Sequence, residues 1–277
     1  IKNTKNKLNF IKNILSLSIL IKLINFHYLI KYIKDINMKI IIGINTYHAD
    51  SSACILIDGK LIAAIEEERI NRKKHFSGYP IESIKECLRI ANKKDYEITD
   101  IAFNTKPTSN LIKKIFFFLK NLSFKNNQFI KRFNKKIKIK EVLFNEFKLK
   151  KNINFHFIEH HLAHIASAFY PSGFDHANGL SIDGSGDFVS FALATCKKNK
   201  IKIIKKTYFP NSLGIFYHAM TQFLGYKNYG DEYKIMGLAA YGKPKYFDKI
   251  RNELFKENNI DLFKLNIKYF NHHKKNF

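Results

Sequence analysis

The chain is poor in cysteine, and its few cysteines are far apart. Of its 277 residues only three, Cys54, Cys87 and Cys196, are cysteine. Their number is odd, and no two of them form a Cys-X-X-Cys pair. This excludes a disulfide framework and a structural zinc knuckle, and it favours a reducing, cytoplasmic location.

Arginine and acidic residues are also scarce for a chain of this charge. The 48 lysines and arginines stand against 23 acidic residues, which gives a formal charge of +25, yet only five of the basic residues are arginine. Arginine is the side chain that makes bidentate contacts with phosphates and bases. We therefore expect no specific nucleic-acid partner, in spite of the charge.

A long uninterrupted hydrophobic run is missing as well. The apolar stretch at residues 14–30 is broken by three polar residues, and its longest unbroken part is shorter than the roughly 20 residues that a bilayer-spanning helix needs. No transmembrane segment is expected. Because the first methionine, Met38, directly precedes an apolar strand, we interpret residues 1–37 as an extension outside the domain. A basic helix on a membrane surface is the alternative.

Apolar residues make up 45% of the chain, enough for a sizeable core. Residues 39–66 are typical of three consecutive strands, the last two joined by the hairpin pair Asp58-Gly59. Pro80 then opens an amphipathic helix, and residues 98–104 form the next predicted strand.

The same order of elements is predicted again farther along the chain. A strand at residues 179–183 is followed by a polar loop, two more strands, and a helix capped by Ser212. Residues 39–92 show the same succession. We therefore predict an α/β protein with a duplicated ribonuclease-H-like fold of the actin, sugar-kinase and Hsp70 type, with its second half incomplete.

A strongly basic segment lies between the two halves. Residues 110–150 contain twelve lysines and arginines against two glutamates, and their phenylalanines and isoleucines have no strict period. We predict a helical insertion here, either solvated or serving as a partner surface. The domain itself is predicted to comprise residues 38–277.

Two histidines have the spacing of metal ligands. His160 and His164 are four residues apart, so on a helix both imidazoles lie on one face, within reach of one ion. Asp183, after the next strand, supplies a carboxylate of the kind that completes such sites. We predict that these three residues bind a divalent metal, iron or zinc. His161 is a rival partner for His164, and histidines that bind no metal are the simpler explanation of the pattern.

A glycine-rich acidic loop, residues 183–187, follows the first strand of the second half. Gly184 and Gly186 let the backbone approach a phosphate, and the loop amides beside Ser185 can form an anion-binding nest. Asp187 and the aspartate that opens the loop would repel each other unless a cation or a donor lies between them. We predict that this loop binds the cofactor; a tight hairpin turn is the alternative.

The corresponding loop of the first half offers acid–base chemistry. His48 can act as a general base near neutral pH, Asp50 can orient it, and Ser51 can bind phosphate. Lys74 and His75 follow a predicted strand that should line the same cleft, so they are candidates to bind an anionic substrate. A histidine in a loop is often inert, and a charged strand end is often simply solvated.

One further lysine lies in a dense motif. Lys234 belongs to residues 230–242, where glycines interrupt an apolar helical pattern. Its ammonium can pair with a phosphate of the cofactor. A helix packed through glycine contacts explains the motif equally well.

Three blocks resemble the O-carbamoyltransferases of the NodU/CmcH type. They are GINTYHADSSA at 43–53 with EEER at 66–69 and KH at 74–75, EHHLAHIASAF at 159–169 with DGSGD at 183–187, and DEYKIMGLA at 231–239. The blocks stand in the family's order, and the resemblance covers about residues 38–273.

This resemblance implies an activity, a fold and a set of roles. Members of the family transfer a carbamoyl group from carbamoyl phosphate, through a carbamoyl-adenylate made with ATP and Mg²⁺, to a hydroxyl or amine of a sugar, an antibiotic or a nodulation-factor-like lipo-oligosaccharide. Their amino-terminal domain is actin-like and similar to threonylcarbamoyl-transfer enzymes, and a carboxy-terminal YrdC-like domain makes the adenylate. The family's metal ligands fall on His160, His164 and Asp183, and its catalytic histidine and lysine on His48 and Lys74.

The chain departs from the family pattern at its carboxyl end. The YrdC-like half, and a carboxylate ligand expected later in the family's sequence, are not among these 277 residues. We therefore expect the amino-terminal part of a larger or split enzyme, without complete turnover by itself. The alternatives are an ATP-binding phosphotransferase or ATPase of the same fold, and an inactive truncated remnant.

Overall fold

Five strands form the first sheet. The computed structural model describes residues 38–48, 50–120, 138–256, 262–270 and 272. The sheet has the order β3-β2-β1-β4-β5, and its strands are β1 (Ile40–Asn45), β2 (Ser52–Ile57), β3 (Lys60–Glu66), β4 (Asp100–Phe103) and β5 (Asn154–Phe157). β1, β2 and β3 are antiparallel neighbours, whereas β4 is parallel to β1 and β5 to β4.

The turn between β2 and β3 confirms the predicted hairpin. Asp58 and Gly59 have φ angles of 49° and 80°, the left-handed conformations that suit a two-residue turn between twisted strands. Asp58 also accepts a hydrogen bond of 2.9 Å from the backbone N–H of Lys39, at the start of the neighbouring strand. The turn therefore helps to set the register of the first three strands.

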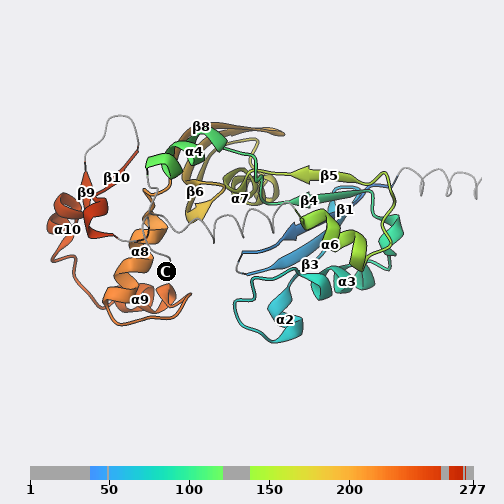
Figure 1. Cartoon of the computed structure of the whole chain (residues 1–277), viewed down its shortest axis with the longest axis horizontal. Helices are drawn as coiled ribbons and strands as arrows, with labels where there is room; N and C mark the ends of the chain where they lie inside the picture. Colours follow the sequence, from blue (N-terminus) through green and yellow to red (C-terminus); the bar gives the residue numbers. More distant parts are fainter. Residues whose placement is uncertain (1–37, 49, 121–137, 257–261, 271, 273–277) are drawn as a thin grey trace, which may run out of the picture.

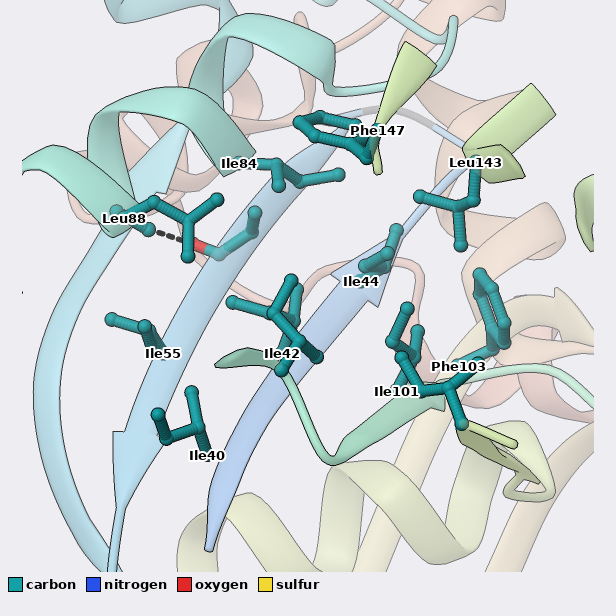
Figure 2. Packing of buried hydrophobic residues seen from close by; sticks show 14 of the residues in the cluster. Ile40, Ile42, Ile44, Ile55, Ile84, Leu88, Ile101, Phe103, Leu143 and Phe147 are labelled. Carbon is teal, nitrogen blue, oxygen red and sulfur yellow. Dashed lines mark hydrogen bonds between the residues drawn. The ribbon is translucent and has the colours of Figure 1, made fainter. Parts of the chain in front are cut away.

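The core of this half lies between the sheet and two helices (Figure 2). Side chains of a strand alternate between its faces, and alternate residues of β1 are buried. Helix α3 (Ile81–Ile90) covers them with the apolar face that its sequence predicts, and α6 (Ile139–Glu146) lies on the same core. Its most buried members include Ile42, Ile55, Ile84, Ile101, Phe103 and Leu143.

Three more helical elements belong to this part of the chain. They are α2 (Glu67–Asn71), the 3-10 turn η1 (Asp95–Glu97) and α4 (Leu111–Lys120). The basic segment predicted as a helical insertion thus contains α4 near its start and α6 near its end, while residues 121–137 lie outside the described residues. Its identity as an insertion stays a prediction.

The second sheet has three antiparallel strands in the order β6-β7-β8. They are β6 (His176–Gly186), β7 (Val189–Lys197) and β8 (Lys200–Tyr208). Helix α7 (His160–Phe169), followed by the 3-10 turn η2 (Tyr170–Ser172), packs against them through Ile165 and Phe169, which meet Ala192, Ala194 and Cys196. In Figure 1, α7 lies between the two sheets, which occupy different halves of the molecule.

The helix α8 (Leu213–Phe223) begins as the sequence predicts. The hydroxyl of Ser212 accepts a hydrogen bond of 3.0 Å from the backbone N–H of Ile215 and caps the helix. The remaining elements are α9 (Glu232–Ala239), α10 (Phe247–Leu254), β9 (Phe255–Lys256), β10 (Lys264–Leu265) and the 3-10 turn η3 (Ile267–Tyr269).

The observed fold is mixed α/β, as predicted, with two separate sheets. Among the residues that the model describes, none of the helices combines the length and the apolar character needed to cross a membrane. The extension and surface-helix interpretations of residues 1–37 concern a segment outside the described residues.

Candidate active site

Both predicted metal-binding histidines lie on α7. The helix begins at His160, so His160 and His164 stand one turn apart on one face. Their Nε2 atoms are 3.0 Å apart, and their ring centroids are 4.5 Å apart. His160 is buried, whereas the side chain of His164 is 52% exposed. One ligand position is thus anchored in the protein and the other borders solvent.

The predicted carboxylate reaches the same point from β6. The pairing of β6 with β7 is irregular between Ile182 and Gly186, so Asp183 lies in a bulge that leaves the regular ladder. Its Oδ2 is 2.7 Å from Nε2 of His160 and 3.8 Å from Nε2 of His164. Contacts with these two imidazoles keep the pKa of Asp183 far below its usual range.

This arrangement suits a divalent cation. The Nε2 atom of His160 lies close to both Asp183 and His164, but a single N–H can be directed at only one of them. A cation would use the lone pairs of all three groups at once, and imidazole nitrogens with a carboxylate are common ligands of zinc and iron. The three side chains can therefore hold a metal ion.

The rival histidine has a different function. His161 is fully buried, with Nδ1 2.7 Å from the hydroxyl of Ser181 and Nε2 2.8 Å from the carbonyl oxygen of Val189. Nε2 therefore donates to the carbonyl and Nδ1 accepts from the hydroxyl. Burial lowers the pKa of this imidazole, which favours the neutral ring. Both ring nitrogens are used within the fold, so His161 ties α7 to the second sheet.

Asp187 is a junction between the two halves. Its Oδ1 accepts a hydrogen bond of 2.8 Å from the Thr105 hydroxyl, and its Oδ2 accepts bonds of 2.7 and 3.0 Å from the backbone N–H groups of Lys106 and His160. These donors, with the His160 ring beside Asp183, relieve the repulsion expected between the two aspartates. Asp187 thus fixes the start of α7 to the loop after β4.

The glycines of the same loop permit close contacts. A Cβ at Gly186 would lie only 1.9 Å from Cδ2 of His160, so no other residue fits there without displacing the ring. The backbone N–H of Gly184 donates to Oδ1 of Asp183 at 2.5 Å. Ser185 and Gly186 line a cavity of about 650 Å³. The loop that was predicted to bind the cofactor thus borders this cavity.

The first loop brings His48 to this cluster. The ring centroids of His48 and His160 are 5.5 Å apart. One ring nitrogen of His48, one ring nitrogen of His160 and one carboxylate oxygen of Asp183 all lie within 4.8 Å of one another. Ser51 is buried and donates its hydroxyl to the carbonyl oxygen of Gly78 at 2.7 Å. Ser51 therefore shapes the loop, and the role predicted for it with phosphate stays a prediction.

Asp50 pairs with His75. One of its carboxylate oxygens is 3.0 Å from Nδ1 of that imidazole. His75 lines the same 650 Å³ cavity as His48, His160 and Tyr229. Lys74 is exposed and does not line this cavity. The sequence singled out His75 as one of two candidates, and the structure places it, rather than its neighbour, at the cavity wall.

Lys234 lies on α9, away from the cavity lining. Its ammonium forms an ion pair of 2.7 Å with Asp231, which also accepts a hydrogen bond from the backbone N–H of Asn228. Within the described residues, this lysine therefore stabilises the start of α9. Its predicted phosphate contact stays a prediction.

Acidic side chains surround Tyr229, which lines the 650 Å³ cavity. Burial raises the pKa of the Tyr229 hydroxyl, and the charges of Asp50, Asp183 and Glu232 raise it further. A second cavity of about 800 Å³ lies between α7 and the first sheet, lined by residues that include Gly43, Cys54, Ala102, His164 and Ser167. The imidazoles of α7 thus lie between two hollows of different polarity.

A comparison of the sequence with protein families identifies the group to which the chain is similar. The family model described as "Carbamoyltransferase N-terminus" matches residues 40–276. The chain belongs to the carbamoyltransferase family. The matched range begins at the first residue of β1 and includes the two histidines, the aspartates and the loops described above.

Several relatives support the assignment to the carbamoyltransferases. The chain is 36% identical over 245 residues to an uncharacterized protein of Synechocystis sp., covering 85% of this chain and 40% of that protein. It is 37% identical over 202 residues to the nodulation protein NolNO of Sinorhizobium fredii, covering 72% and 29%. An uncharacterized protein of Methanocaldococcus jannaschii is 31% identical over 201 residues, covering 73% and 33%. The carbamoyltransferase chain thus spans less than half the length of these relatives.

Among solved structures, YeaZ from Pseudomonas aeruginosa is similar at 11% identity. The match covers 62% of this carbamoyltransferase chain and 68% of YeaZ, with a TM-score of 0.34.

Proposed function

We propose that this chain provides the carbamoyl-transfer site of a carbamoyltransferase. The reaction moves a carbamoyl group from a carbamoyl-adenylate, made from carbamoyl phosphate and ATP, to a hydroxyl or amine of a small molecule. The observation that carries the proposal is the convergence of His160, His164 and Asp183 at one point beside a cavity, in a chain that belongs to this family. The similarity to a nodulation protein favours a small-molecule acceptor.

The proposed fold is a duplicated ribonuclease-H-like unit. Support comes from the strand order: three consecutive antiparallel strands begin each sheet, β1-β2-β3 in the first and β6-β7-β8 in the second. In both halves a helix follows the third strand, and a polar loop follows the first. The site then lies where the two polar loops meet, which is where this class of fold places its ligand.

His160, His164 and Asp183 would hold the divalent metal of the proposed enzyme. The ion supplies positive charge that polarises a carbonyl or phosphoryl oxygen. The protein's own contribution is to position the ligands: Asp187 fixes the backbone of His160 at the start of α7, and Gly186 gives its ring the space it occupies. Second-sphere contacts of this kind orient ligands and tune their affinity.

The other residues have roles set by where they lie. The turn with Ser185 and Gly186 borders the cavity and would receive the donor phosphate through its backbone. Lys74, exposed near the cavity wall, would meet the anionic donor. His48 lies against His160 and faces the same cavity, where it would act on the group being transferred.

Metal analysis and a double variant test the proposal. We expect the purified chain to bind about one equivalent of iron or zinc, measured by mass spectrometry of the metals. His160→Ala with His164→Ala should abolish this binding and the transfer of a radiolabelled carbamoyl group from carbamoyl-adenylate supplied as the donor. His176→Ala, which changes an exposed histidine of β6, is the matched control. Metal content and transfer that survive the double variant would refute the proposed site.

A further inference from the structure

His75 is held from two sides by acidic residues. Oε2 of Glu68 accepts a hydrogen bond of 2.8 Å from its backbone N–H, and Oδ1 of Asp50 is 3.0 Å from its Nδ1. The residue has a φ angle of 55°, in the left-handed region that side chains adopt uncommonly. Both the backbone and the ring of His75 are therefore placed by specific contacts.

The contact with Asp50 decides which ring nitrogen carries the proton. A carboxylate accepts a hydrogen bond, so the neutral imidazole of His75 has its N–H at Nδ1 and a lone pair at Nε2. The described part of the chain contributes no hydrogen bond to Nε2. That nitrogen is thus left able to accept a proton.

Gly230, in the second half of the chain, lies close to Nε2. A Cβ at Gly230 would lie 2.8 Å from Nε2, and the φ angle of 83° at Gly230 also suits glycine. The neighbouring Tyr229 packs edge-on against the His75 ring, with centroids 5.4 Å apart. With glycine at position 230 no side chain crowds this nitrogen, and Tyr229 packs against the ring.

His75 shares the 650 Å³ cavity with His48 and His160. Two imidazoles with different surroundings thus face one space: His48 lies against a proposed metal ligand, whereas His75 is oriented by a carboxylate. The pairing of a carboxylate with Nδ1 of a histidine is the arrangement that general bases use to keep the correct tautomer.

We propose that His75, in place of the His48 that the sequence predicted, is the general base of carbamoyl transfer and that Asp50 is its positioning residue. Nε2 takes the proton of the acceptor hydroxyl while the acceptor oxygen bonds to the carbamoyl carbon. The bond from that carbon to the phosphate oxygen breaks, and its electron pair leaves with the phosphate group. The proton then passes from His75 to solvent. This inference rests on the proposed function and names the residue that activates the acceptor.

The inference predicts a dependence on the acceptor. A hydroxyl or water molecule must lose a proton as it attacks, and a positioned base accelerates such steps by about 100- to 10,000-fold. Hydroxylamine is a stronger neutral nucleophile and depends less on a base. The ratio of transfer to water over transfer to hydroxylamine therefore reports the base directly.

We would measure both transfers with the purified chain, supplying radiolabelled carbamoyl-adenylate directly as the donor, and counting released carbon dioxide and hydroxyurea. His75→Gln is expected to lower the ratio about 100-fold, and Asp50→Asn about 10-fold. His176→Gln, at an exposed position of β6, should leave it unchanged. A ratio in His75→Gln within twofold of wild type would overturn the inference, and a wild-type chain that transfers to neither acceptor would instead count against the proposed function.

A spectroscopic measurement tests the inference without turnover. Long-range nitrogen–proton correlation spectra at pH 8 report the tautomer of each histidine, and His75→Gln identifies the signals of this ring. We expect Nδ1 protonated and Nε2 bare in the wild type, and loss of this preference in Asp50→Asn. A ring with its proton at Nε2 would refute the role of His75 as base.

Discussion

Replacement of Asp187 should show that the two halves of the chain are coupled through one buried carboxylate. The residue is 7% exposed, and within the described part of the chain its carboxylate accepts hydrogen bonds from the Thr105 hydroxyl and from the backbone N–H groups of Lys106 and His160. Hydrogen bonds to a charged group contribute about 1.5–3 kcal/mol each, and an abandoned buried donor costs about 1–3 kcal/mol. Asp187→Ala leaves these three donors without their acceptor. We expect it to lower the free energy of unfolding by about 3–5 kcal/mol, because water that enters the site can accept some of the hydrogen bonds.

Asp187→Asn separates charge from shape. Its amide oxygen can still accept from the two backbone donors, while the Thr105 hydroxyl can turn and accept from the amide nitrogen. Only the charge assistance is lost, and we expect a cost of about 1–2 kcal/mol.

Urea unfolding followed by far-ultraviolet circular dichroism measures both Asp187 variants, since the chain has no tryptophan. Asp175→Ala, at an exposed aspartate before β6, is the control and should change stability by less than about 0.5 kcal/mol. The reasoning fails if Asp187→Ala stays within about 1 kcal/mol of wild type, or if the asparagine variant is the less stable of the two.

The other predictions concern the site and the pH range of stability. Gly186→Ala places a Cβ 1.9 Å from Cδ2 of His160, so overpacking should cost about 1–3 kcal/mol in urea unfolding and lower the metal content. Ser212→Ala removes a buried hydroxyl that caps α8 and donates to the carbonyl oxygen of Asp183 at 2.9 Å; we expect a loss of about 1–2 kcal/mol. For Asp100, burial opposes ionisation, but hydrogen bonds from histidine and threonine and a nearby lysine charge outweigh it and lower the pKa to about 2. Because this pKa is below the unfolded value of about 3.9, the ionised carboxylate stabilises the fold above pH 4, and this contribution is lost as the pH falls to 2. Asp100→Asn should therefore lower the free energy of unfolding by at most about 2 kcal/mol above pH 4, and the difference from wild type should vanish as the pH falls to 2. Removal of divalent ions with a chelator should abolish donor binding measured by calorimetry, and added zinc or iron should restore it.

The sequence allowed much of the fold to be predicted because local signals and burial agreed. The Asp58-Gly59 turn and the cap at Ser212 stand where expected, since each satisfies a backbone requirement within a few residues. The exact start of α7 is not set by such a local signal. Its first turn is stabilised by Asp187, whose carboxylate accepts from the backbone of His160 across 27 positions of sequence, and no local pattern reports such a contact.

The candidate site divides in the same way. Spacing on one helix was sufficient to associate His160 with His164, and the structure brings Asp183 to them. The partner of Asp50 was harder to predict: sequence proximity favours His48, but the carboxylate meets His75, which is 25 positions away. The course of the chain after β3 brings His75 to Asp50. Tertiary contacts determine that course, so the sequence around Asp50 does not reveal the pair.

The position of the site also explains why the basic composition says little about the ligand. The chain has a formal charge of +25, yet Asp187 lines the cavity, and Asp50 and Asp183 contact two of the histidines that line it. The charges of Asp50 and Asp183 add to burial in raising the pKa of Tyr229. Lys74 is exposed outside the cavity lining. A phosphate entering alone would meet charge of its own sign, at a local dielectric lower than that of water. Bound cations reverse the local electrostatics of such sites, so an anionic carbamoyl donor should bind here only together with a metal ion, which is why we expect chelation to act on binding before it acts on chemistry.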